Sequence, residues 1–74
     1  MKTATFRKVK LSIGRSTAYG HYTIQSTYRG KNLTALTTDS QAFDYLDDDS
    51  DKELHQAAKR HCYSKIVQAY ENSI

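Results

Sequence analysis

Residues 19–38, YGHYTIQSTYRGKNLTALTT, constrain the fold more than any other stretch of the sequence. Two runs rich in Thr, Tyr, Ile and Leu lie on either side of the segment Arg29-Gly30-Lys31-Asn32, and apolar and polar residues alternate within each run. Alternation with a period of two indicates half-buried strands, and a short glycine-containing segment between two such runs predicts a hairpin. We therefore expect strands over 20–28 and 32–37.

The turn of this hairpin has two possible registers. Gly30 and Lys31 can form a two-residue loop, or Arg29 and Gly30 can form it. Side chains alternate strictly between the two faces, so both registers give the same division. One face is apolar, with Tyr22, Ile24, Tyr28, Leu33 and Ala35. The other face is polar.

A further strand is expected at 6–13. Val9, Leu11 and Ile13 alternate there with Lys8, Lys10 and Ser12, which favours a strand with one buried side. Phe6 has the wrong parity for this face, so we place it before the regular strand or beyond a bulge. Residues 1–5 are expected to fray, and residues 14–19 to form a polar connection.

Two helices are expected after the strands, over 39–46 and 51–72. Thr38 with Gln41, and Ser50 with Glu53, match the capping-box pattern that begins a helix. In the second helix, Leu54, Ala58, Cys62, Ile66 and Ala69 fall within one arc of about 120°. The prediction is an α+β fold in a single domain over 1–74, with three antiparallel strands covered on one face by the long helix.

Composition narrows the classes of function. The single cysteine excludes an internal disulfide, and no cysteine pair has zinc-ligand spacing. An unpaired thiol and the lack of an apolar signal-like run favour the cytoplasm. Nothing in the sequence calls for a cofactor, a small-molecule substrate or a membrane partner.

Two groups of residues suggest a metal site and a catalytic set, but each lacks something that the chemistry requires. Asp47, Asp49 and Asp51 imitate the start of a calcium loop, but Lys52 stands where glycine is needed and Ala58 where a bidentate Glu is needed. His55 and Cys62 share a helix face but lie about 10 Å apart along it, which is beyond hydrogen-bond reach. We expect no metal site, no catalytic set and no enzyme.

Charge is unevenly distributed along the chain. Residues 1–33 hold seven Lys and Arg and no acid, whereas residues 34–53 hold seven acids and one Lys. The two segments could neutralise each other inside the fold. Alternatively, the first segment could present a basic face to nucleic acid or to an acidic partner.

The polar side of the sheet is the expected DNA-binding surface. Its cations would hold phosphates, and its amides and hydroxyls would contact bases or sugars. The expected nucleic-acid-binding residues are Lys8, Lys10, His21, Thr23, Gln25, Thr27, Arg29, Lys31, Asn32 and Thr34. In its order of elements the chain resembles the β-β-β-α DNA-binding domains of some phage-type integrases and of a class of plant transcription factors, which read the major groove with one sheet face. No signature residues of those domains match this sequence, so the resemblance assigns no role to any individual residue.

The alternative function is a protein-interaction module that does not bind nucleic acid. Tyr63, Val67 and Tyr70 extend the apolar arc of the long helix beyond what one small sheet should cover. Two such helices could pair along this strip and form a homodimer.

Overall fold

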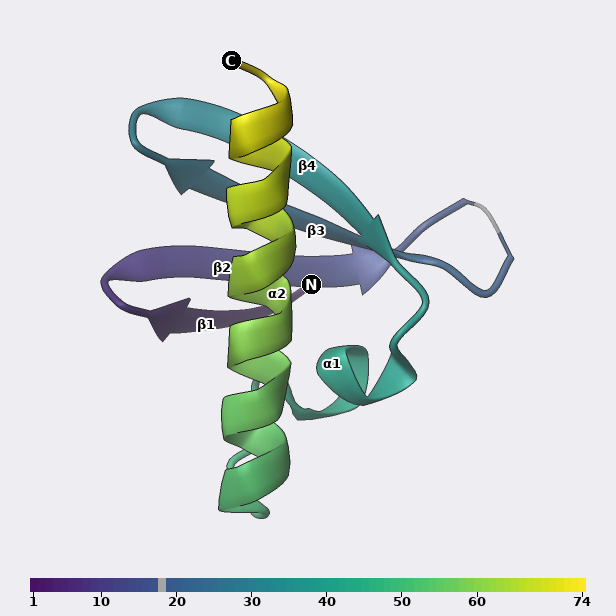
Figure 1. Ribbon diagram of the computed structural model, residues 1–74. Coiled ribbons are helices and arrows are strands. Elements are labelled where there is room, and N and C mark those ends of the chain that lie inside the picture. Colours follow the sequence, from purple (N-terminus) through teal and green to yellow (C-terminus); the bar gives the residue numbers. More distant parts are fainter. Residues whose placement is uncertain (18) are drawn as a thin grey trace.

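A computed structural model describes residues 1–17 and 19–74 as a four-stranded antiparallel sheet with two helices (Figure 1). The strands follow one another in the sheet in chain order. The elements are β1 (Lys2–Phe6), β2 (Val9–Arg15), β3 (Tyr22–Tyr28), β4 (Lys31–Thr37), α1 (Ser40–Tyr45) and α2 (Lys52–Asn72). The α+β class, the antiparallel sheet and the long C-terminal helix are confirmed, but the sheet has four strands and not three.

The additional strand is β1, where the sequence predicted a frayed end. Phe6 pairs with Val9 across a two-residue turn made of Arg7 and Lys8, so the expected strand over 6–13 is in fact two strands. Two residues on either side of such a turn lie on the same face, which explains the parity of Phe6. The turn lacks the usual Asn-Gly signal: Arg7 and Lys8 themselves adopt positive φ angles of 51° and 65°.

The second hairpin takes one of the two expected registers. Tyr28 pairs with Lys31, so Arg29 and Gly30 form the loop, with φ angles of 51° and 79°. Both hairpins therefore turn through two residues of positive φ, as in a type I′ turn. The expected connection over 14–19 includes Ala18, which lies outside the described residues, while Gly14 and Arg15 belong to β2.

The core lies between the sheet and α2, which crosses the strands on one face (Figure 1). Leu11, Ile13 and Ile24 are fully buried there against Cys62 and Ile66 of the helix. The small residues Ala58 and Cys62 let the helix approach the sheet closely. The opposite face of the sheet is left uncovered.

An aspartate caps the N-terminus of each helix, in place of the Thr38 and Ser50 that the capping-box pattern suggested. Asp39 accepts hydrogen bonds from the backbone N–H groups of Gln41 and Ala42, and Asp51 accepts one from Leu54. A carboxylate at this position satisfies free N–H groups and suits the positive end of the helix dipole. Within the described ranges, neither helix has the length and apolar content needed to cross a membrane.

Candidate nucleic-acid interface

The open face of the sheet carries six of the ten residues that the sequence assigned to nucleic-acid binding. The pairing register places these on one side, away from the helix: Lys10, Thr23, Gln25, Thr27, Asn32 and Thr34. Five of the six line a shallow hollow of about 520 Å³, and Thr23 is half-buried beyond it. Within it the Thr27 hydroxyl donates to Oδ1 of Asn32 at 2.7 Å.

The expected concentration of cations on this face is wrong, because the other four residues lie elsewhere. Lys8 and Arg29 belong to the turns, where the alternation of the strands does not apply. Lys31 lies on the helix side, and its Nζ lies 3.3 Å from the Ser73 hydroxyl. The His21 ring contacts the backbone carbonyl of Tyr19 at the other end of β3. Among the described strand residues on the open face, only Lys10 is charged.

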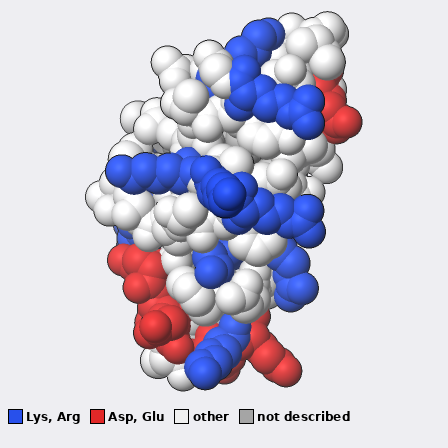
Figure 2. Space-filling model, turned by 90° about the vertical axis from the view of Figure 1, so that its left-hand side faces the viewer, with Lys and Arg blue, Asp and Glu red and all other residues white. Residues whose placement is uncertain are grey.

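Positive charge gathers instead at the end of the sheet where both hairpin turns lie. Here we define the basic end as Arg7, Lys8, Lys10, Arg29 and Lys31. Figure 2 looks onto this end and shows Lys and Arg side chains spread over its upper and middle parts, with Asp and Glu mostly toward the bottom. The residues predicted from the sequence did not include Arg7, because the Arg7-Lys8 dipeptide is not a usual turn signal. The wrong parity of Phe6 was the one indication of it.

The acidic segment does not neutralise this end. Within residues 1–17 and 19–74, the only Lys or Arg that pairs with a carboxylate is Lys2, whose Nζ lies 3.8 Å from Oδ1 of Asp47. The Asp48 carboxylate accepts a hydrogen bond from the backbone of Ser50, which lowers its pKa. The charges of the basic end are therefore available to a ligand.

Aromatic rings on the helix side support the cations of the basic end. The Arg7 guanidinium lies 5.6 Å from the centroid of Phe6 and 5.9 Å from that of Tyr63. The Arg29 guanidinium lies 5.6 Å from Tyr28 and 5.8 Å from Tyr70. Cations over ring faces at these distances are attracted by the ring quadrupole. Hydrogen bonding to Tyr28 also raises the pKa of Arg29.

The residues assigned to self-association take part in the same aromatic cluster. Tyr63 packs edge-on against Phe6 and Tyr28, and Tyr70 packs edge-on against Tyr28. Hydrogen bonding to Tyr28 is the largest cause of a raised pKa at Tyr63. With Val67 also half-buried, contacts within the chain occupy much of this strip. Self-association through it stays a prediction.

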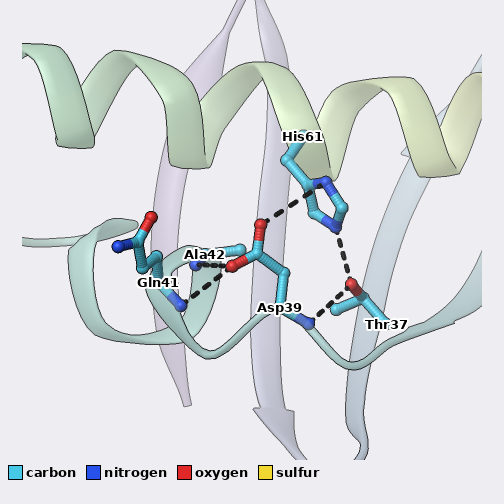
Figure 3. Close-up of polar contacts among 5 residues, drawn as sticks. All are labelled: Thr37, Asp39, Gln41, Ala42 and His61. Carbon is cyan, nitrogen blue, oxygen red and sulfur yellow. Dashed lines mark hydrogen bonds and ion pairs between the residues drawn. The ribbon is translucent and has the colours of Figure 1, made fainter.

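A polar cluster ties β4, α1 and α2 together at another position (Figure 3). His61 Nε2 lies 2.6 Å from the Thr37 hydroxyl, and His61 Nδ1 lies 3.8 Å from a carboxylate oxygen of Asp39. The order hydroxyl, imidazole, carboxylate resembles a catalytic triad. However, Thr37 is only 5% exposed, its oxygen accepts the Asp39 N–H, and the imidazole–carboxylate distance exceeds hydrogen-bond reach. The cluster therefore acts as a structural clamp.

The one cysteine, Cys62, is buried in the core. Burial, and secondly the charge of Asp39, raise the pKa of the Cys62 thiol to about 12, so it stays protonated. Within the described part of the chain, no three His, Cys, Asp or Glu residues group so as to hold a metal ion. Comparison with protein-family models, with curated proteins and with solved structures finds no match to this chain.

Proposed function

We propose that the protein binds nucleic acid and that the basic end contacts the phosphate backbone. The observation that carries the proposal is the grouping of five cations at two adjacent turns, with no carboxylate paired to any of them among the described residues. Such a patch attracts polyanions from solution. Two of the five are arginines, whose planar guanidinium groups bind phosphate oxygens in a bidentate manner.

The backbone at the turns supports a role for these charges. Arg7, Lys8 and Arg29 all have positive φ angles. This conformation costs about 1–2 kcal/mol for a residue other than glycine. Asn or Gly would fill such positions at lower cost. Residues held in such sparsely populated backbone conformations cluster at active sites and ligand-binding segments.

The proposed site continues from Lys10 onto neighbouring residues of the open face of the sheet. Gln25, Thr27 and Asn32 offer amide and hydroxyl groups that can contact sugars or base edges next to the bound phosphates. Because Oδ1 of Asn32 accepts the Thr27 hydroxyl, the amide N–H groups of Asn32 can serve as donors to a ligand.

Salt dependence tests the proposal. If all five cations contact phosphates, the logarithm of the binding constant should fall with the logarithm of salt with a slope of about −4.5. Between about 50 and 200 mM salt, the affinity for a duplex of about 20 base pairs should then fall about 500-fold. Fluorescence anisotropy of labelled DNA measures both quantities.

Two variants locate the contact. In the double variant Arg7→Gln/Arg29→Gln the slope should drop to about −2.7, so the same change in salt should weaken binding only about 40-fold. Arg15→Gln is the matched control, because the Arg15 guanidinium also lies over an aromatic ring, 5.3 Å from the Phe43 centroid, but at the opposite end of β2. The proposal fails if DNA does not bind at low salt. It fails equally if the control changes the slope as much as the double variant does.

A further inference from the structure

Each of the two turns of the basic end carries an arginine that lies over a ring of α2. The pairing of β2 with β3 ends at Leu11 opposite Ser26, two residues before the last strand residue at each turn. Val9 and Tyr28 are the strand residues next to the two turns. The Arg7 guanidinium lies over Tyr63 and that of Arg29 over Tyr70, and these two rings are seven residues, or about 10 Å, apart along α2. Figure 1 shows both turns on the same side of the molecule.

This spacing corresponds to a feature of double-stranded DNA. The minor groove of B-form DNA is about 6 Å wide, so the two phosphate rows beside it are about 10–12 Å apart, centre to centre. Arg7 and Lys8 on one turn can reach one row while Arg29 on the other turn reaches the second. In A-form RNA the minor groove is wide and shallow, so the phosphate rows beside it are farther apart than those beside the minor groove of DNA.

The basic end also lacks what a single-stranded ligand needs. Proteins that bind single strands stack the bases on aromatic faces. Here Phe6, Tyr28, Tyr63 and Tyr70 pack against one another, and Arg7, Arg29 or Lys31 lies over each ring.

Neither the open face nor the exposed Tyr19 offers such a stacking surface near the turns. The described strand residues of the open face include no aromatic side chain. Tyr19 is fully exposed, but it lies beyond the far end of β3, about 20 Å from the turns.

We infer that the ligand of the basic end is double-stranded DNA, held across its minor groove with one hairpin turn on each phosphate row. This inference rests on the proposed function and narrows the class of nucleic acid. The fold sets the distance between the two arginines, and the aromatic rings hold their side chains in place. The protein would therefore recognise the shape of the duplex and not its base sequence.

Three labelled probes of equal length test the inference with the wild-type protein at one salt concentration: duplex DNA, one of its strands alone, and duplex RNA of the same sequence. We expect duplex DNA to bind about tenfold more tightly than the single strand, and more tightly than duplex RNA. A single strand or an RNA duplex that binds as tightly as duplex DNA would overturn the inference and leave the proposed function standing. If none of the three binds, both are wrong.

Arg7→Gln and Arg29→Gln measured separately give a second readout. Because each turn contacts one phosphate row, each substitution should reduce the preference for duplex DNA over the single strand by a similar factor. A preference that depends on only one of the two arginines would contradict the two-row arrangement.

Discussion

Replacing Arg7-Lys8 by Asn-Gly should stabilise the protein and weaken its binding of DNA at the same time. The two residues form the first hairpin turn with φ angles of 51° and 65°, where Asn followed by Gly is the favoured pair. If the turn is only a connection, its best sequence is the one with the least strain. If it is a binding site, the substitution removes two of the five cations that hold the ligand.

The gain in stability follows from three contributions. A side chain in the left-handed conformation costs about 1–2 kcal/mol, which glycine at position 8 avoids and asparagine at position 7 reduces. Glycine gives back about 0.5–1 kcal/mol as entropy of the unfolded chain. Loss of the Arg7 guanidinium over Phe6 and Tyr63 costs about 0.5–1 kcal/mol. The two costs together offset the gain at position 8, so the net gain is the strain that asparagine relieves at position 7, at most about 1 kcal/mol.

Thermal unfolding followed by circular dichroism measures this gain. In a domain of this size, 1 kcal/mol corresponds to a rise in melting temperature of about 4–8 °C. Arg29→Asn is the matched variant, because it creates the same Asn-Gly pair in the second turn and should also raise the melting temperature, by less. A melting temperature that falls in both variants would refute the reasoning from strain. Unchanged DNA affinity in the stabilised variant would refute the role of the turn in binding.

Two further predictions concern the interior. His61→Ala leaves the buried Thr37 hydroxyl without its imidazole partner, so urea unfolding should show a loss of about 1–3 kcal/mol, against less than about 0.5 kcal/mol for the exposed Gln68→Ala on the same helix. Burial raises the pKa of the Cys62 thiol from 9.0 to about 12, so this thiol ionises at lower pH in the unfolded chain than in the folded protein. The free energy of unfolding should therefore fall as the pH rises from about 9 to 12, by up to about 1.4 kcal/mol per pH unit. Cys62→Ala should lack this component. Parallel pH curves for the two proteins, or an equal loss in the two helix variants, would contradict these assignments.

The fold could be predicted where periodicity was strong. Alternating residues around Ile24 and Leu33 indicated the second hairpin and its faces under either register, because a period of two fixes which side chains share a side. The arc through Ala58, Cys62 and Ile66 indicated the covering helix. Both patterns arise because buried positions hold apolar residues, so the spacing of apolar residues in the sequence reveals them.

The first hairpin could not be predicted from the same rules. Its turn consists of Arg7 and Lys8, two residues that turn statistics disfavour at positive φ, so the segment read as one continuous strand. Without that turn, the parity of Lys8 assigned it to the open face.

The position of the candidate site also differs from the prediction because of the turns. Lys10, Gln25, Thr27 and Asn32 lie on the open face as their parity requires, whereas Arg29 is a loop residue and has no strand face. The stacking of cations over rings from β1, β3 and α2 is a tertiary arrangement. It depends on how the helix crosses the sheet, which local sequence patterns do not specify.

A backbone-amide chemical-shift map with duplex DNA tests the central claim most directly. We expect the largest changes at residues 7–10 and 27–32, around the two turns, and little change at Tyr19, Gly20 and His21 at the opposite end of the sheet. Changes concentrated at that opposite end, or along the exposed side of α2, would contradict the assignment of the basic end as the contact surface.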